Sequence, residues 1–263
     1  MRVVNLSSGS KGNSTYIETT QAKILVDDGI SFSNLKNRLD QISVNPLEID
    51  AILLTHEHSD HLYGIKTFLK KNKLAKVYIP AFVQNYCLPS IFEFPPSQVV
   101  WFTNSTFFIK DVLVNAFVLP HDSHFCVGYN LVSENRKISI ATDLGFVSLD
   151  TLKNLENSDI LFLESNHDEK LLIKNPKYSA HLKKRILSNN GHLSNVASAQ
   201  AICSLVKKGV KQVVLAHLSE ENNTPELAYS TVKAVLLKNG IIEGEHVCVD
   251  VCYQDKIGTI FNL

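Results

Sequence analysis

The segment from Ala51 to His61 holds the densest set of reactive side chains in the chain. Four apolar residues, 51–54, run directly into His56, His58, Asp60 and His61. The short apolar run predicts a buried strand, and the polar residues follow where that strand leaves its sheet. Burying such groups without partners would cost roughly 2–7 kcal/mol each, so packing alone does not explain them. Two ligand pairs at one strand-to-helix junction can serve two metal ions side by side.

Four other apolar runs end in the same way. The pattern predicts strands over 112–119, 137–142, 159–163 and 210–215, and an ionisable residue follows each of them: His121, Asp143, Glu164 and His217. In layered α/β folds the ends of such strands gather at one edge of a sheet, where sites collect. The repetition therefore predicts one site whose side chains come from the ends of five strands.

The remaining elements frame these strands. Three strand-like segments near the N-terminus predict a hairpin within 1–29, and apolar spacing predicts helices over 33–42, 62–71, 178–188, 194–207 and 225–237. The last two strands, 247–253 and 258–261, are expected to pair as a terminal hairpin. Nothing between these elements has the composition of a linker, so we expect a single domain over 1–263.

Composition limits the classes of partner. The formal net charge is zero and the sequence pI is about 7.1, which gives no global footprint for nucleic acid or membrane. Local basic runs at 66–76, 183–185 and 207–211 would suffice for nucleic acid, although each can equally be a solvated helix face. Five cysteines without a C-x-x-C pair favour a reducing compartment. With no leader and no membrane-length apolar run, we expect a cytoplasmic protein without a membrane partner.

The pattern H-x-H-x-D-H at 56–61 resembles the signature of the metallo-β-lactamase superfamily. Further stretches at 7–14, 164–168, 191–195 and 216–219 are similar to the bacterial YycJ/WalJ (VicX) branch, and the resemblance covers essentially the whole chain. It implies an α/β (α+β) fold, a four-layer αββα sandwich. One departure is Asp27-Asp28-Gly29, where Asp-Ala-Gly is usual in the superfamily.

The resemblance also implies a dinuclear metal centre. His56, His58 and His121 would hold one ion, Asp60, His61 and His217 the second, and Asp143 would bridge them. The implied ligand set is thus His56, His58, Asp60, His61, His121, Asp143 and His217. Nitrogen and oxygen donors fit two divalent ions, zinc or manganese, and iron also fits.

Two features favour phosphodiesters over the other substrates that this superfamily hydrolyses. His192 resembles a histidine of tRNA 3′-processing phosphodiesterases that assists the leaving group, with Glu164 or Asp168 to polarise it; the alternative is a helix cap. The loop with Ser10, Lys11 and Asn13 offers donors for a phosphate, or is an ordinary turn. His167 and Asp168 are further candidates for substrate contact.

The branch resemblance implies a 5′-to-3′ exonuclease that acts on DNA in repair, encoded near a two-component signalling operon. The interval 144–217 leaves no room for the helical domain of β-CASP nucleases. In this interpretation Asp60 orients the attacking water, and His192 with Glu164 protonates the departing oxygen. The alternatives are a thioester or lactone hydrolase on the same metal site, or a non-catalytic metal-binding regulator linked to two-component signalling. Metal identity, DNA against RNA, direction and oligomeric state stay open.

Overall fold

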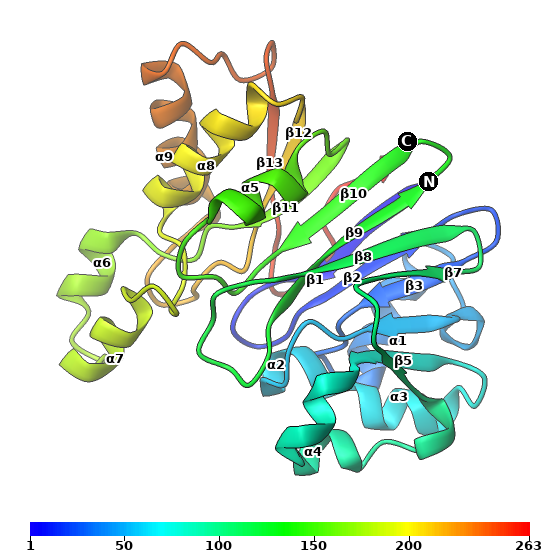
Figure 1. Ribbon diagram of the computed structural model, residues 1–263. Coiled ribbons are helices and arrows are strands. Elements are labelled where there is room, and N and C mark those ends of the chain that lie inside the picture. The colour runs from blue at the N-terminus through cyan, green and yellow to red at the C-terminus, as the bar shows by residue number, and fades with distance from the viewer.

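Two seven-stranded β-sheets face each other in the computed structural model, which describes residues 1–263 (Figure 1). The first sheet has the order β14-β1-β2-β3-β4-β5-β6. Its strands are β1 Arg2–Ser7, β2 Ser14–Glu18, β3 Lys23–Val26, β4 Ala51–Leu53, β5 Lys76–Pro80, β6 Val99–Phe102 and β14 Ile260–Asn262. β1, β2 and β14 pair in antiparallel fashion, whereas β3 to β6 are parallel to one another.

The second sheet has the order β13-β12-β11-β10-β9-β8-β7. Its strands are β7 Thr106–Ile109, β8 Val112–Val118, β9 Val127–Ser133, β10 Arg136–Ala141, β11 Ile160–Glu164, β12 Gln212–Ala216 and β13 Cys248–Val251. β10 to β13 are parallel, while β9 is antiparallel to both β8 and β10. β8 therefore runs in the same direction as β10, β11 and β12.

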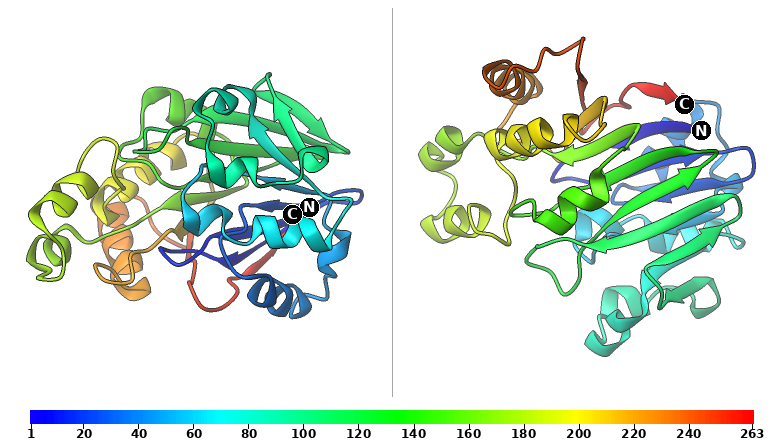
Figure 2. Two further views of the ribbon diagram at one scale, coloured as in Figure 1. Left: turned by 90° about the horizontal axis from the view of Figure 1, so that it is seen from below. Right: turned by 45° about the horizontal axis from the view of Figure 1, so that its top comes forward.

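Helices cover the outer face of each sheet (Figures 1 and 2). On the first sheet lie α1 Phe32–Asp40, α2 Ser59–Leu62, α3 Ile65–Lys71 and α4 Pro89–Phe92, with the 3-10 turns η1 Pro46–Glu48, η2 Ala81–Tyr86 and η3 Pro96–Gln98. The helices on the side of the second sheet are α5 Leu149–Leu155, α6 Glu169–Lys174, α7 Ala180–Ile186, α8 Asn195–Val206 and α9 Pro225–Lys238. None of these helices combines the length and the apolar character that a membrane span requires.

Three buried hydrophobic clusters hold these layers together. Leu53 and Phe162 belong to the cluster between the two sheets. Leu35 of α1 packs on the outer face of the first sheet, and Ile202 of α8 packs on that of the second. Each such side chain, fully buried, contributes about 1.5–3 kcal/mol relative to exposure. The arrangement is the expected four-layer αββα sandwich, and the predicted fold class is confirmed.

The five chemistry-bearing strands end at the same side of the molecule, as the sequence predicts. β8, β10, β11 and β12 share one direction within the second sheet, so their carboxyl ends line up. β4 belongs to the first sheet, but its end is joined to the second: Tyr129 donates a hydrogen bond to the carbonyl of Leu54 at 2.7 Å. The site therefore lies at an edge shared by two sheets, not at the edge of one.

Two predicted elements are wrong in detail. The last two strands form no hairpin, because β13 pairs with β12 in the second sheet and β14 pairs with β1 in the first. The predicted helix over 62–71 begins later, as α3 at Ile65, and a separate short helix, α2, ends at Leu62. Gly64 lies between them, and its N–H donates to the carbonyl of Asp28 at 2.7 Å. β6, β7, α5 and α6 are further elements that the pattern did not indicate.

Asp28 is a buried carboxyl without compensation. Its side chain is fully buried and neither oxygen has a hydrogen-bond partner. Burial, reinforced by the charge of Asp27, raises the pKa of Asp28 to about 8. The folded protein therefore keeps a proton here that the unfolded chain releases near pH 4, and stability is lost as the pH rises between these two values.

We expect Asp28→Ala to raise the free energy of unfolding by about 2–4 kcal/mol at pH 8 and by much less at pH 5, because the substitution removes this penalty. Urea unfolding of both proteins at the two pH values measures the difference. Asp40→Ala, which removes an exposed carboxylate paired with Lys36, is the matched control and should change stability by less than about 0.5 kcal/mol. A destabilised Asp28→Ala at pH 8 would contradict this account.

Candidate metal centre

A short connection between β4 and α2 orients the motif residues at 56–61. His58 is the N-terminal cap of α2, so the short helix carries Asp60 and His61 back over the end of the strand. Gly29 makes this approach feasible, because a Cβ at Gly29 would lie 1.6 Å from the backbone oxygen of Asp60. The glycine thus lets the loop after β3 pass directly beneath α2.

Three residues of this centre have left-handed backbone conformations. The φ angles are +61° at Asp27, +63° at Asp143 and +55° at His217, and each residue directly follows or nearly follows the end of its strand. Such a conformation costs about 1–2 kcal/mol for a residue with a side chain. Strain of this kind is retained where the surrounding structure needs a side chain in one orientation.

His56, His58 and His121 form a first group of donors. The Nε2 atom of His56 lies 3.0 Å from Nδ1 of His58, and Nε2 of His121 lies 3.3 Å from the same atom. The candidate ligand atoms all lie within 4.8 Å of one another. Ring nitrogens that face one another in this way leave lone pairs for a shared cation, which is the donor chemistry of a metal site.

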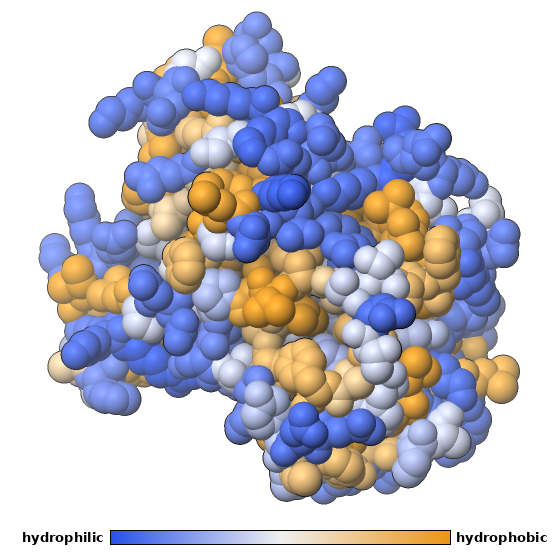
Figure 3. Space-filling view, viewed as in Figure 1, coloured by the Kyte–Doolittle hydropathy of each residue, from blue (hydrophilic) through white to orange (hydrophobic).

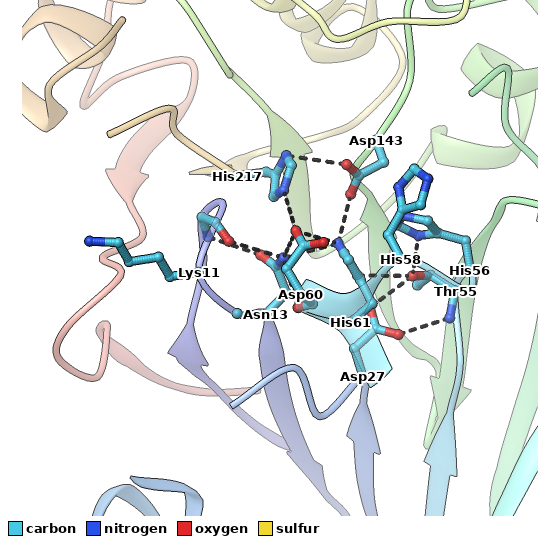
Figure 4. Close-up of polar contacts among 12 residues, drawn as sticks. Lys11, Asn13, Asp27, Thr55, His56, His58, Asp60, His61, Asp143 and His217 are labelled. Atoms are coloured by element: carbon cyan, nitrogen blue, oxygen red, sulfur yellow. Dashed lines mark hydrogen bonds and ion pairs between the residues drawn. The ribbon is translucent and has the colours of Figure 1, made fainter. Parts of the chain in front are cut away.

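Asp60, His61 and His217 form a second group within the same distance limit (Figure 4). Oδ2 of Asp60 lies 3.4 Å from Nε2 of His217 and 3.5 Å from Nε2 of His61. Asp143 sits between the groups, with Oδ2 3.2 Å from His61 and Oδ1 3.3 Å from His217. That Oδ2 is buried without a well-formed hydrogen bond, so the residues present fit a group that carries positive charge.

Opposite charges hold the second group together electrostatically. Burial alone would lower the pKa of His217, but Asp143, Asp60 and Glu164 raise it to about 10. Burial likewise opposes ionisation of Asp143, yet His217 and His61 hold its pKa well below the usual range. In the first group, burial and the neighbouring imidazoles lower the pKa of His56, which keeps that ring neutral and able to bind a cation.

Asp27 is a site residue that the sequence did not single out. Its Oδ2 accepts from Nδ1 of His61 at 2.7 Å, and its two oxygens also accept from the backbone and hydroxyl of Thr55 (Figure 4). Because a carboxylate can only accept here, Nδ1 carries the proton and Nε2 of His61 is left facing the cluster. A carboxylate behind a metal-binding histidine is a recurrent support in metal sites. The signals in the sequence were its position just after β3 and its match to the first residue of the superfamily's Asp-Ala-Gly.

His192 and Glu164 are in direct contact, as the sequence analysis expected. Nδ1 of His192 lies 2.7 Å from Oε1 of Glu164, and the same oxygen lies 3.0 Å from Nδ1 of His217. Burial alone would raise the pKa of Glu164, but the two histidines lower it to about 2. Burial also tends to lower the pKa of His192, and Glu164 and Asp143 reverse that effect and raise it. The expected alternative partner, Asp168, does not contact His192.

An open pocket of 240 Å³ exposes part of this cluster. Its floor is formed by His58, Asp60, Asp143, His192 and His217. The other residues that line it are Ser10, Asp122, Asn166, Tyr178, Leu182, Arg185, Ile186, Gly191 and Ser219. This volume is below the roughly 300–1,000 Å³ of sites that enclose a whole ligand, so it suits one segment of an extended substrate.

The structure brings only one of the loop donors to this pocket. Ser10 lines it, but Lys11 points away from the cluster and pairs with Glu220 at 2.7 Å (Figure 4). Asn13 is turned inward, where its amide lies 2.9 Å from Nε2 of His61 and 3.2 Å from Oδ2 of Asp60. Asn13 therefore contacts candidate ligands, not the pocket.

His167 and Asp168 also lie away from the pocket. The ring of His167 is buried, both of its nitrogens lack partners, and burial lowers its pKa to about 4. Asp168 caps α6 by accepting from the N–H of Leu171 at 2.9 Å. His167 is thus part of the packed interior and Asp168 is a helix cap, and neither residue lines the pocket. His124, three residues after His121, pairs with Glu57 at 2.9 Å on the surface.

Comparison with known proteins places the chain in a family. The model of the Beta-lactamase superfamily domain matches residues 22–218. Exodeoxyribonuclease WalJ of Streptococcus pneumoniae is 35% identical over 233 residues, which are 86% of this chain and 85% of that protein. Exodeoxyribonuclease YycJ of Bacillus anthracis is 35% identical over 242 residues, 91% and 90% of the two chains.

A solved structure shows the same fold at low sequence identity. The metallo-β-lactamase fold protein YhfI of Bacillus subtilis superposes with a TM-score of 0.72 at 14% identity, covering 99% of this chain and 98% of that one. Together with the four-layer αββα sandwich and the histidine–aspartate clusters, these matches confirm the resemblance seen in the sequence. The chain belongs to the metallo-β-lactamase superfamily, in the branch of the WalJ and YycJ proteins.

Proposed function

We propose that this protein is a metal-dependent phosphodiesterase that degrades DNA from the 5′ end. The observation that carries the proposal is the contact between His192 and Glu164 beside two groups of metal-binding donors in one pocket. Two relatives of matching length that are named exodeoxyribonucleases support a DNA substrate. Such an enzyme would act in the cytoplasm, where its substrate lies.

The metal centre is proposed to hold two divalent ions. His56, His58 and His121 would hold one, Asp60, His61 and His217 the other, and Asp143 would be shared between them; zinc and manganese both suit these donors. When bound, such ions act as Lewis acids on a phosphoryl oxygen and lower the pKa of water.

The protein's own groups then have distinct tasks. Asp60 lines the pocket floor with its carboxylate 3.4 Å from His217, where it can orient an incoming water as well as bind metal. His192 also lines the floor, and its Nδ1 faces Glu164, which leaves Nε2 as the atom that can donate a proton. A departing alkoxide needs such a proton far more than a thiolate does, because thiols have a pKa near 8.5. This difference favours a phosphodiester over a thioester.

The proposed substrate can be tested directly. We expect the protein with Mn²⁺ or Zn²⁺ to shorten 3′-labelled DNA progressively. With 5′-labelled DNA, the first labelled product should be a mononucleotide. Asp143→Asn should lose at least about 100-fold in rate, since it removes the charge shared by both groups of donors. RNA, a thioester and a lactone are assayed in parallel. Hydrolysis of the thioester or lactone with intact DNA and RNA would identify the rival hydrolase, and no hydrolysis at all would favour a regulator.

The acid role of His192 predicts a leaving-group effect. His192→Ala should lower the turnover of DNA about 10²- to 10⁴-fold, and should cost much less on a p-nitrophenyl phosphodiester whose leaving group needs no proton. Because Glu164 raises the pKa of His192, Glu164→Gln should move the alkaline limb of the pH–rate profile to lower pH. The exposed His246→Ala is the control. Full DNA turnover by His192→Ala at unchanged metal content would exclude the role.

Asp27 should determine how tightly the second ion is held. Asp27→Asn keeps the shape of the side chain but removes the charge that fixes the His61 tautomer, so we expect metal affinity to fall about 10- to 100-fold. Competition with a chromophoric chelator measures this affinity without any turnover. Asp40→Asn, on the surface of α1, should leave it unchanged. Equal affinities of the Asp27→Asn and wild-type proteins would remove Asp27 from the centre.

A further inference from the structure

The α6–α7 segment, residues 169–186, stands out from the body of the protein as a separate lobe (Figures 1 and 2). α7 has no buried residue, so the hydrophobic core does not explain its presence. Its surface mixes hydrophobic and hydrophilic side chains (Figure 3), and it carries the basic run Lys183-Lys184-Arg185 that composition alone left unassigned. The lobe therefore needs an explanation other than packing.

One face of α7 forms a wall of the metal-centre pocket. Leu182, Arg185 and Ile186 of α7 line it, and their spacing of three and four residues places them on the same side of the helix. Tyr178, two residues before the start of α7, lines the same pocket. Tyr178 is the only residue with a six-membered aromatic ring in this pocket, and Arg185 is its only lysine or arginine. A cation and a stacking surface, the two chemistries that bind a nucleic-acid strand, thus line the reaction site from α7 and the turn that precedes it.

Arg185 is held in an orientation that leaves its terminal amino groups available. Its Nε donates to Oδ2 of Asp122, and its two NH₂ groups form no hydrogen bond within the protein. The side chain is about half exposed, so this ion pair adds little to stability. A guanidinium fixed through Nε presents the remaining donors as a fork, which matches the geometry of phosphate oxygens.

The lobe is also tied to the candidate catalytic groups. The N–H of His192 donates to the carbonyl of Ile186 at 3.0 Å, and Nδ1 of His121 contacts the carbonyl of Gly191 at 3.2 Å. From the other side, Lys177 pairs with Glu221 at 2.8 Å, just beyond the strand that carries His217. These contacts set the distance between the α7 wall and the pocket floor.

We propose that this wall is the strand-binding subsite, in which Arg185 contacts the phosphate next to the scissile one and Tyr178 stacks on the neighbouring base. The proposal rests on the proposed function as a nuclease. It assigns to Arg185 the phosphate contact that the sequence suggested for Lys11, whose ammonium is engaged with Glu220 outside this pocket. The occupant is a single strand, because stacking requires an unpaired base.

Binding of a labelled 5′-phosphorylated phosphorothioate oligothymidylate to the metal-loaded protein, followed by fluorescence anisotropy over a range of NaCl concentrations, tests the subsite without turnover. Arg185→Ala should raise the Kd about ten-fold and reduce the slope of log affinity against log salt by about 0.7, the value for one phosphate contact on a single strand. Arg185→Lys should keep the slope with an intermediate Kd. Tyr178→Ala should also raise the Kd about ten-fold, with the slope unchanged, whereas Tyr178→Phe should bind as the wild type does.

Lys184→Ala is the matched control, because Lys184 lies beside Arg185 on α7 but outside the pocket. It should leave both Kd and slope unchanged. If Lys184→Ala acts as strongly as Arg185→Ala, or if Arg185→Ala retains the wild-type slope, the subsite is wrong even though the wild type degrades DNA. A wild type that neither binds nor degrades DNA would instead overturn the proposed function, and this inference with it.

Discussion

Mutual compensation among buried imidazole and carboxylate groups is the constraint on which this structure depends. His61, Asp143, Glu164 and His217 are all buried where two sheets meet, and none of them could be there alone. Removing an isolated charge from water costs far more than a small domain's stability, whereas opposite charges at 3.0–3.3 Å offset much of that cost. The same weak screening makes the cluster a strong site for a cation, so stability and metal binding depend on the same contacts.

The directions of the strands bring these buried charged groups together. Four strands of the second sheet deliver their ends to one edge because β9 reverses the chain between β8 and β10. The first sheet supplies the motif residues that follow β4 and Asp27 that follows β3, and the bond from Tyr129 to Leu54 holds the end of β4 against the second sheet. The left-handed residues at Asp27, Asp143 and His217 then turn the side chains inward. Backbone strain at three positions is tolerated because the layers on either side fix the strands independently of it.

The sequence predicts those parts of the molecule that local pattern determines. Apolar runs followed by ionisable residues give the strands and their order along the chain, and the family motif gives the sandwich; both are confirmed. The assignment of each residue to a metal or to substrate stays a prediction. Pattern fails where partners are distant in sequence: β14 pairs with β1, across the whole chain, although a short connection from β13 suggested a hairpin. The contact of Asp27 with His61 was not predicted for the same reason, since the two residues are 34 positions apart in the sequence.

Lys11 and Arg185 show how far such distant contacts can mislead a prediction about function. In sequence, Lys11 lies in a glycine- and serine-rich loop typical of anion binding, while Arg185 lies in an ordinary basic run. In the structure Glu220 engages the first, and Asp122 fixes the second at the pocket wall. The floor of the pocket follows core strands: Asp143 comes after β10 and His217 after β12, and both residues are buried. α7 has no buried residue, so the contacts to the substrate strand that we propose for it can vary without disturbing the core strands.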